Sequence, residues 1–213
     1  MPIVEDLKRS AERLTGIGRP PRRKLDRLVR LRRPELYRFE DDGHNALLPL
    51  VVYRGAERLD GRYDPAAVFE ETFACHGWRG SWRDGIYPFQ HFHTATHEVL
   101  GIARGRVAIR FGGAKGRTLK LTAGDVVVLP AGTGHQRIRA TADLLVVGAY
   151  PAGGHYDEPK PDEVDHDDAA ASIARTKLPR KDPVYGSDGP LIDLWKKART
   201  AARHVHRRPK PAP

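Results

Sequence analysis

Short apolar runs follow one another from residue 86 onward, and turn residues separate them. Runs of this length are typical of strands, and Gly112-Gly113 and Ala123-Gly124-Asp125 are turn signals. Because almost no helical pattern lies between the runs, their density favours an antiparallel barrel or sandwich, an all-β fold. The strands that these patterns predict span about 86–93, 97–104, 106–111, 117–121, 125–129, 135–140 and 143–150.

A further strand is expected from Leu47 to Tyr53, where Pro49 favours a strand start or a sheet edge. The next segment, with Trp78 and Trp82, is rich in turn residues. We expect its two indoles either to plug one end of the barrel or to contact a ligand.

Apolar residues recur at helical spacing in several other segments. Near the start of the chain, Val4, Leu7, Ala11 and Leu14 lie three to four positions apart, as on one face of a helix. Asp64-Pro65 marks another helix start, because Asp is a preferred N-cap and Pro fits the first helical position. The predicted helices, all short, span about 2–16, 22–31, 65–77, 168–175 and 189–202.

Positive charge is concentrated at the two ends of the chain. The 213 residues carry a net charge of +10, of which residues 1–33 and residues 195–213 contribute +7 each, which leaves −4 for the middle. A basic surface confined to the ends makes nucleic-acid binding an unlikely role for the middle of the chain. The expected organisation is a basic helical extension over 1–33, a barrel over 34–150, a C-terminal segment packed on it over 151–197 and a basic disordered tail over 198–213.

Both basic ends are expected to be dispensable for the barrel. The first is expected to be a solvated or loosely docked extension, and the alternative is an arm that binds an acidic partner or nucleic acid. The apolar face of Leu191, Leu194 and Trp195 needs a cover, either the barrel or a second subunit, and the barrel leaves edge strands. We therefore expect a homodimer. The acidic, proline-broken stretch 157–168 is interpreted as a surface loop, with a hard-cation site as the alternative.

Several classes of protein are disfavoured by the sequence. No run of eighteen apolar residues appears, which argues against a membrane span, and no secretory signal is visible. Cys75 is the single cysteine, so an internal disulfide is impossible, in agreement with a cytoplasmic protein. Cys75 itself is expected to be a buried apolar residue of its helix.

A candidate metal site lies between residues 85 and 105. His91, His93 and Glu98 occur within eight positions of one another. On a strand, His91 and His93 would point to the same face, roughly 6–7 Å apart. A second glycine-bounded stretch supplies His135. Three neutral imidazoles and one carboxylate suit a first-row divalent metal, with coordination positions left for solvent or substrate.

Both stretches resemble the two sequence motifs of the cupins. The first motif reads Gly, five residues, His-x-His, three or four residues, Glu, six residues, Gly, and the residues that fit are Gly85, His91, His93, Glu98 and Gly105. The second motif reads Gly, five residues, Pro-x-Gly, two residues, His, three residues, Asn, and the residues that fit are Gly124, Pro130, Gly132 and His135. Arg139 stands at the Asn position, which is not usually a metal ligand in the family.

More narrowly, the chain resembles the bacterial YjlB-type cupins over roughly 34–197. The segments that carry this likeness are Leu47-Leu48-Pro49-Leu50, Gly77-Trp78, His97 to Gly101, Asp182 to Gly186 and Gly189-Pro190-Leu191. The resemblance implies a single cupin (jelly-roll) barrel with a metal held by His91, His93, Glu98 and His135. It implies little about the reaction, because cupins carry many chemistries on one barrel.

Other residues of the candidate site follow from their positions on the predicted strands. On the predicted strand, the side chains of Tyr87 and Phe89 point to the same face as those of His91 and His93. They should line a largely apolar pocket with Val107 and Ile109. Arg137 points to the same face of its predicted strand as His135, and it either holds an acidic substrate or is a solvated charge. His97 should point away from Glu98, as a supporting or structural residue rather than a ligand. The sequence assigns no catalytic residue.

The favoured function is that of a cytoplasmic metalloenzyme of dioxygenase type that acts on a small organic molecule. Iron, manganese or nickel is the expected metal, and zinc also accepts this ligand set. One alternative is a non-catalytic barrel that binds or senses a small molecule. Another is a metal-dependent isomerase of sugar-like substrates.

Overall fold

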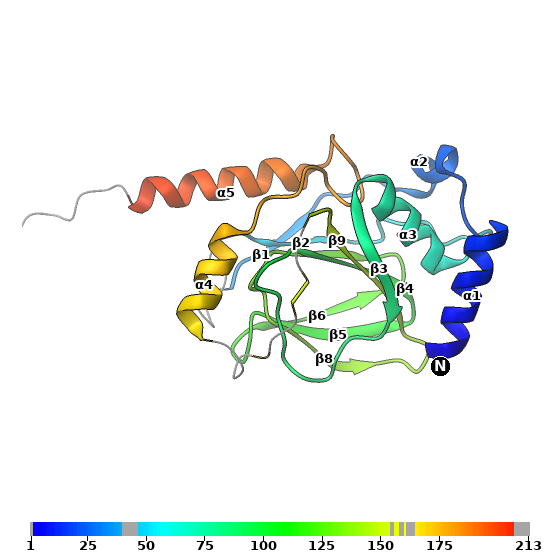
Figure 1. Ribbon diagram of the computed structural model, residues 1–213, viewed down its shortest axis with the longest axis horizontal. Coiled ribbons are helices and arrows are strands. Elements are labelled where there is room, and N and C mark those ends of the chain that lie inside the picture. Colours follow the sequence, from blue (N-terminus) through cyan, green and yellow to red (C-terminus); the bar gives the residue numbers. More distant parts are fainter. Residues whose placement is uncertain (1, 40–46, 154–155, 158–159, 161–164, 207–213) are drawn as a thin grey trace, which may run out of the picture.

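The computed structural model describes residues 2–39, 47–153, 156–157, 160 and 165–206. These residues form two antiparallel sheets, one six-stranded in the order β1-β2-β7-β4-β9-β3 and one three-stranded in the order β6-β5-β8. The two sheets face each other as in a cupin-like jelly roll (Figure 1), and the described strands do not close into one continuous barrel. The strands are β1 Glu35–Tyr37, β2 Leu50–Tyr53, β3 Trp78–Asp84, β4 Glu98–Arg104, β5 Arg106–Phe111, β6 Arg117–Thr122, β7 Val126–Leu129, β8 His135–Ala140 and β9 Leu145–Pro151.

The structure confirms the predicted strands from residue 97 onward to within two residues at each end. The prediction of a strand over 86–93 is wrong, because that stretch contains only one isolated bridge, between His91 and His135. The prediction of turns around Trp78 and Trp82 is also wrong, since these residues belong to β3. Gly80 has a left-handed φ of +63° and the pairing register with β9 shifts beside it, which hides the alternating pattern of this strand.

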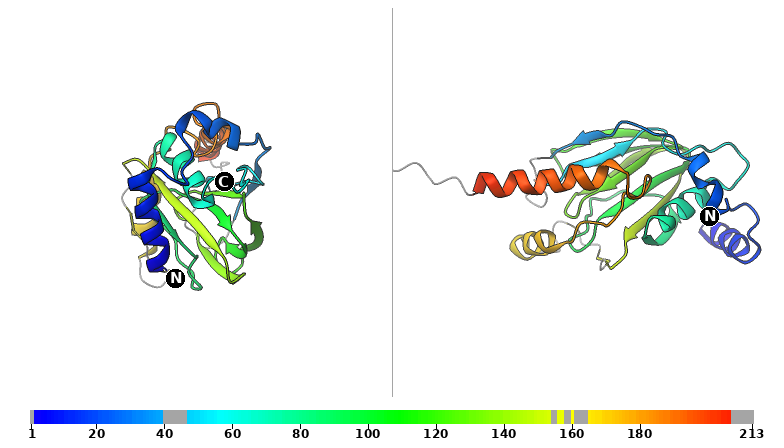
Figure 2. Two further views of the ribbon diagram at one scale, coloured as in Figure 1. Left: turned by 90° about the vertical axis from the view of Figure 1, so that its right-hand side faces the viewer. Right: turned by 90° about the horizontal axis from the view of Figure 1, so that it is seen from above.

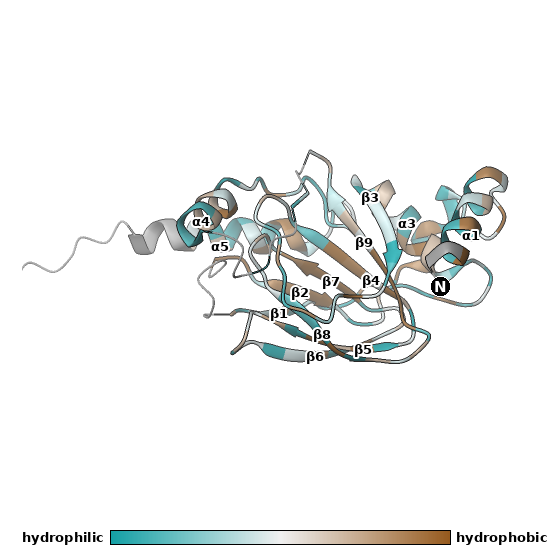
Figure 3. Cartoon of the chain, turned by 60° about the horizontal axis from the view of Figure 1, so that its bottom comes forward, coloured by the Kyte–Doolittle hydropathy of each residue, from teal (hydrophilic) through white to brown (hydrophobic). Residues whose placement is uncertain are grey.

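Apolar side chains fill both faces of the six-stranded sheet. Its inner face packs against the three-stranded sheet, and this inner cluster includes Leu100 and Val127 on one side and Ile109 and Leu121 on the other. Figure 3 shows the corresponding run of apolar colour through β2, β4 and β7. The outer face is covered by helices, through Phe69, Phe73 and Trp195 among others. Val107 and Ile109, predicted to line a pocket, belong to this packed apolar interior.

The helices lie outside the two sheets (Figures 1 and 2). Their bounds are α1 Pro2–Thr15, α2 Leu25–Leu28 after a 3₁₀ turn at Arg22–Lys24, α3 Pro65–Cys75, α4 His166–Arg175 and α5 Pro190–His206. Helix α3 begins as predicted, with the Asp64 side chain accepting a hydrogen bond from the Ala67 N–H at 3.1 Å. The helix predicted over 22–31 is much shorter, and α5 continues beyond its predicted end into the segment expected to be disordered. Residues 207–213 of the predicted tail lie outside the described residues.

Helix α5 packs its apolar face on its own chain. Leu191 and Trp195 are fully buried, and the Trp195 indole N–H donates a 2.9 Å hydrogen bond to the Pro49 carbonyl. Of the two covers considered from the sequence, the barrel is therefore the one used in the structure. This face gives no reason to expect a second subunit, and the homodimer stays a prediction.

Helix α1 is attached to the barrel by buried ion pairs, which corrects the expectation of a loosely docked arm. The Arg83 side chain on β3 has no exposed surface, and its guanidinium lies 2.9 Å from carboxylate oxygens of Glu12, Asp64 and Glu70. Arg9 on α1 lies 2.7 Å from Glu70. The charged face of α1 thus points inward. Within the described part of the chain, no helix is both long enough and apolar enough to cross a bilayer.

Candidate metal centre

The segment between β3 and β4 brings the first two histidines to one end of the sheets. Residues 85–97 include Gly85 and Pro88 and form no regular strand. The segment is fixed to β8 where His91 and His135 exchange backbone hydrogen bonds of 3.2 and 2.9 Å. His135 is the first residue of β8 and Glu98 is the first residue of β4. The four side chains therefore meet at one end of the barrel although the predicted strand is absent.

The candidate ligand atoms lie close together and are shielded from solvent. One ring nitrogen from each of His91, His93 and His135 lies within 4.8 Å of the other two, a spacing that could hold a metal ion. Glu98 Oε2 lies 3.3 Å from His93 Nε2 and 3.5 Å from His135 Nε2. All four residues are at most 4 % exposed.

Backbone carbonyls orient the three imidazoles. Nδ1 of His91 lies 3.4 Å from the Phe89 carbonyl oxygen, and Nδ1 of His135 lies 3.3 Å from that of Thr133. Nδ1 of His93 contacts the carbonyl oxygen of Asp157. Because a carbonyl oxygen only accepts hydrogen bonds, the neutral rings carry their hydrogen on Nδ1 and present the lone pair of Nε2 to the centre. Metal-bound histidines are usually oriented in this way.

Electrostatics indicate a cation between these groups. Burial opposes the charge of Glu98, but His93 and His135 outweigh it and lower the pKa of Glu98 to about 2. Burial likewise disfavours a charged His93, yet Glu98 raises the pKa of His93 to about 9. Burial and the neighbouring His91 lower the pKa of His135 to about 3. A proton on His93 therefore balances the buried carboxylate.

Glu98 Oε2 accepts no hydrogen bond of regular geometry from any described residue, although it is buried between two ring nitrogens. A divalent cation would satisfy this oxygen and take the place of the proton. The residues present thus fit a divalent transition metal.

Two supporting residues were missed in the sequence. The Tyr150 hydroxyl on β9 accepts a 2.9 Å hydrogen bond from the Trp82 indole and lies within hydrogen-bonding reach of Glu98, whose pKa it lowers. Asp157 binds the segment between the ligands, because its carboxylate accepts hydrogen bonds from the backbone N–H groups of Thr94 and Ala95. The alternation of side chains along β9 could have placed Tyr150 on the face of the strand that points to the site. No sequence signal distinguished Asp157 from its acidic neighbours.

The other predicted site residues lie around the cluster in different ways. Tyr87 and Phe89 stack on each other at 4.7 Å and approach the His91 ring at 5.1 and 5.8 Å, but they are 45 % and 39 % exposed. They therefore cover the cluster from outside and do not line an interior pocket. Arg137 pairs with buried Ile109 across β5 and β8, and its partly buried guanidinium makes no hydrogen bond with a described residue.

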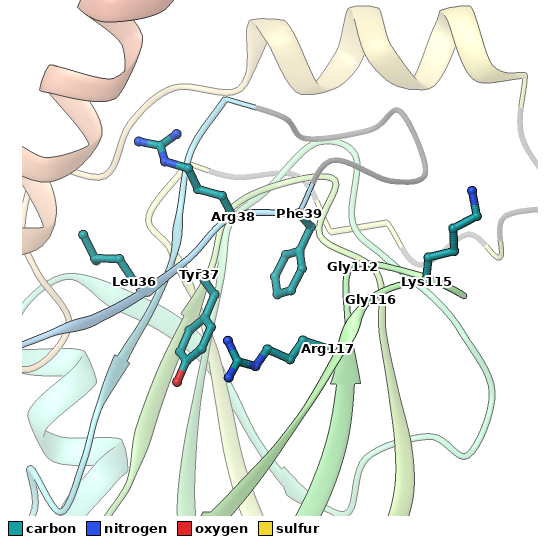
Figure 4. Close-up of a pocket in the computed structure, with 8 residues that line it drawn as sticks. All are labelled: Leu36, Tyr37, Arg38, Phe39, Gly112, Lys115, Gly116 and Arg117. Atoms are coloured by element: carbon teal, nitrogen blue, oxygen red, sulfur yellow. The ribbon is translucent and has the colours of Figure 1, made fainter.

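His97 points away from the cluster. It accepts a 2.9 Å hydrogen bond from the Ala131 N–H on Nδ1 and packs against Trp195 at 4.6 Å, so it connects the sheet to α5. Burial, reinforced by the charge of Arg199, lowers the pKa of His97 to about 3. Cys75 is half-buried rather than buried. A separate pocket lies between β1 and the β5–β6 hairpin, where Tyr37 and Arg117 approach each other (Figure 4), and no candidate metal ligand lines it.

Comparison with known proteins gives one extensive match in sequence. The uncharacterized protein YjlB of Bacillus subtilis (strain 168) is 37% identical over 169 residues, which cover 78% of this chain and 99% of YjlB. No family model matches the chain.

Similar solved structures include three enzymes with different reactions. The acireductone dioxygenase of Bacillus anthracis, with a cadmium ion in its active centre, is 18% identical over 42% of this chain and 65% of its own, with a TM-score of 0.31. The oxalate decarboxylase of Bacillus subtilis is 21% identical over 53% of this chain and 22% of its own, with a TM-score of 0.29. The TDP-fucose-3,4-ketoisomerase WlaRA of Campylobacter jejuni is 11% identical over 44% of this chain and 72% of its own, with a TM-score of 0.33. At such TM-scores these likenesses say nothing about what this chain does.

Proposed function

The chain belongs to the family of the Bacillus subtilis protein YjlB, and we propose that it is a cupin metalloenzyme of dioxygenase type that oxidises a small organic molecule. The observation that carries this proposal is the orientation of the three histidines. A backbone carbonyl faces Nδ1 of each ring, one nitrogen of each ring lies within 4.8 Å of the other two, and His93 and His135 present Nε2 to Glu98. Iron, manganese or nickel suits these ligands best, and zinc remains compatible with them.

A metal bound by these four residues would polarise a substrate and hold it beside dioxygen in one orientation. The chain supplies what surrounds that chemistry. Glu98 contributes one buried negative charge, and neutral imidazoles add none. This leaves one positive charge from a divalent ion to compensate an acidic or enolic substrate.

The stacked rings of Tyr87 and Phe89 restrict the approach of water from outside. Lys160 lies over Phe89, with its Nζ 5.6 Å from the ring centre. In such a partly closed site the charge of a bound substrate is poorly screened. The guanidinium of Arg137, whose buried Nε makes no hydrogen bond with a described residue, is the proposed contact for an acidic group of the substrate.

Metal analysis of anaerobically purified protein tests the site itself. We expect one transition metal ion per chain, and its loss in a His93→Ala variant that keeps its circular dichroism spectrum. Full retention of metal by that variant would exclude the assignment. His97→Ala is the matched control, because His97 lies next to Glu98 in sequence but faces α5, and this variant should keep its metal.

Activity requires a second experiment, with an oxygen electrode and protein reconstituted with each metal. Enediols, diketones, flavonols and oxalate-like acids form the substrate screen, with Glu98→Gln as the control. Oxygen uptake that disappears in the control supports the dioxygenase. Conversion without oxygen indicates the isomerase instead, and a ligand that binds tightly and is recovered unchanged indicates the sensing barrel.

A further inference from the structure

The pocket between β1 and the β5–β6 hairpin has a volume of about 550 Å³. Pockets that bind small molecules typically have volumes of about 300–1,000 Å³. Figure 4 shows the side chains of Tyr37, Phe39 and Arg117 extending into the same space. Arg38 and Lys115 also line the pocket, but their side chains extend away from that space. We call this cavity the hairpin pocket, and its size suits a small organic ligand.

Two glycines leave one wall of the hairpin pocket as bare backbone. Gly112 has a left-handed φ of +81°, and a Cβ at this position would lie 2.3 Å from the Phe39 ring. A Cβ at Gly116 would lie 1.9 Å from the carbonyl oxygen of Phe111. Neither position therefore admits a side chain without a shift of its surroundings. A flat ligand can approach the backbone closely at these two positions.

Arg117 is held in the pocket with its N–H groups available. Its Cζ lies 5.3 Å from the centre of the Tyr37 ring, a cation–π contact made by the face of the guanidinium. No described residue accepts a hydrogen bond from this guanidinium or forms an ion pair with it. The Tyr37 ring is fixed in turn, because its hydroxyl donates a 2.7 Å hydrogen bond to Glu35. The charge of Glu35 is compensated by Arg54 at 3.2 Å.

The sheet beside the pocket carries charge of one sign. Strands β5, β6 and β8 contain no Asp or Glu, although residues 34–194 together carry a net charge of −4. Their basic residues are Arg106, Arg110, Arg117, Lys120, Arg137 and Arg139. Charge of one sign around a site raises the local concentration of ligands of the opposite sign. The surroundings of the hairpin pocket thus favour an anionic ligand.

We propose that the hairpin pocket binds a small organic anion that carries a planar ring. Arg117 holds the carboxylate or phosphate of the ligand, because the guanidinium presents parallel N–H groups that match two oxygens of such an anion. Phe39 packs against the ring, since aromatic rings stack on one another with an offset. The bare backbone at Gly112 and Gly116 gives a flat group room beside Phe39.

This site is separate from the candidate metal centre. Gly112 donates a 2.8 Å backbone hydrogen bond to the carbonyl of Gly134, the residue before His135. The two sites are therefore neighbours along β5 and β8. Among the described residues that line the hairpin pocket there is no candidate metal ligand, and the proposal does not depend on the reaction proposed for the metal.

Isothermal titration calorimetry of the full chain tests the hairpin pocket. The probes are naphthoate and adenosine monophosphate, which join a planar ring to a carboxylate and to a phosphate. We expect at least one of them to bind, and the one that binds tells carboxylate from phosphate. Naphthamide and adenosine lack the charge, and acetate and inorganic phosphate lack the ring, so each should bind at least about tenfold more weakly. Binding of neither probe, or equal binding of an uncharged counterpart, overturns the proposal.

Three arginine variants locate the bound probe. Arg117→Gln should weaken its binding at least about tenfold and, because Arg117 is exposed, keep the thermal unfolding midpoint. Arg106→Gln is the matched control, because it removes the same charge at the other end of the same hairpin, where Arg106 pairs with Thr122. This control should bind like the wild type, and an equal loss in both variants would show that net charge alone matters and overturn the proposal. A loss in Arg137→Gln but not in Arg117→Gln would place the anion at the metal centre and also overturn it.

Discussion

The indole N–H of Trp82 donates a 2.9 Å hydrogen bond to the hydroxyl of Tyr150. That hydroxyl in turn lies within hydrogen-bonding reach of Glu98. Trp82 is positioned by its cross-strand partner Gly148, on which its ring lies directly. A glycine on β9 thus places, through Trp82, the hydroxyl that interacts with a carboxylate at the candidate metal centre.

Replacement of Tyr150 by Phe should weaken metal binding while the barrel stays folded. The change removes the hydroxyl that interacts with Glu98 and lowers its pKa, and loss of a supporting partner of a ligand typically costs about 10–100-fold in affinity. Competition titration with a chelating dye measures the effect. Tyr156→Phe is the matched control, since its ring packs on His93 at 5.4 Å. Equal affinities of the Tyr150→Phe variant and wild type would show that the hydroxyl does not support Glu98.

Gly148→Ala should affect the same group through packing. A Cβ at this position would lie 2.1 Å from the Trp82 ring, so the indole must move away from Tyr150. Overpacking of this kind costs about 1–3 kcal/mol of the free energy of unfolding. Urea denaturation measures the loss, and Gly85→Ala serves as control because nothing lies within 4 Å of its added Cβ. Unchanged stability would mean that β9 adjusts to the methyl group.

Removal of residues 1–33 should destabilise the barrel, contrary to the expectation from the sequence. Arg83 and Glu70 would stay buried while Glu12 and Arg9 are lost. Breaking buried ion pairs from one side costs roughly 3–5 kcal/mol. Chemical unfolding of the shortened and complete chains measures the difference. Removal of residues 207–213 is the comparison, and it should change nothing. A shortened chain as stable as the complete one would show that Arg83 finds other partners.

Glu57 should make the protein less stable as the pH rises. Its side chain is 2 % exposed, neither oxygen makes a hydrogen bond with a described residue, and burial raises its pKa from 4.5 to about 8. The folded state therefore holds a proton that the unfolded state releases between these values. The contribution of Glu57 is fully present below pH 4.5 and is lost as the pH rises through about 8, at up to about 1.4 kcal/mol per pH unit.

Unfolding of Glu57→Gln and wild type across this pH range isolates the effect, because all other titrating groups are common to both proteins. The difference in the free energy of unfolding should favour the variant increasingly as the pH rises. A difference that is constant with pH would show that Glu57 is ionised in the folded protein throughout.

The sequence predicts the strands well where side chains alternate regularly, as along β5 and β6. It fails for β3, where the register shift beside Gly80 interrupts the alternation. The candidate ligands were identified by spacing alone, and the reason given for His91 and His93, a shared strand face, was wrong. They meet because the backbone of His91 pairs with that of His135, a contact 44 positions apart in the chain that local patterns do not encode.

Helix α1 shows a different limit of sequence reasoning. Its apolar spacing indicated a helix, and the usual inference is that this face docks on the core. The opposite face docks instead, because the partner of its acidic residues is Arg83, a buried cation of a strand that the sequence did not predict. Which face of an amphipathic helix is turned inward depends on what the rest of the chain offers to it.

Glu98 belongs to the six-stranded sheet and His135 to the three-stranded sheet. An ion bound by both would thus cross-link the two halves of the sandwich at the end where the chain between them is irregular. The metal would then stabilise the fold as well as take part in the reaction. The thermal stability of the metal-bound protein would rise with the logarithm of the free metal concentration. Cells that run short of this metal would lose the folded protein along with its chemistry.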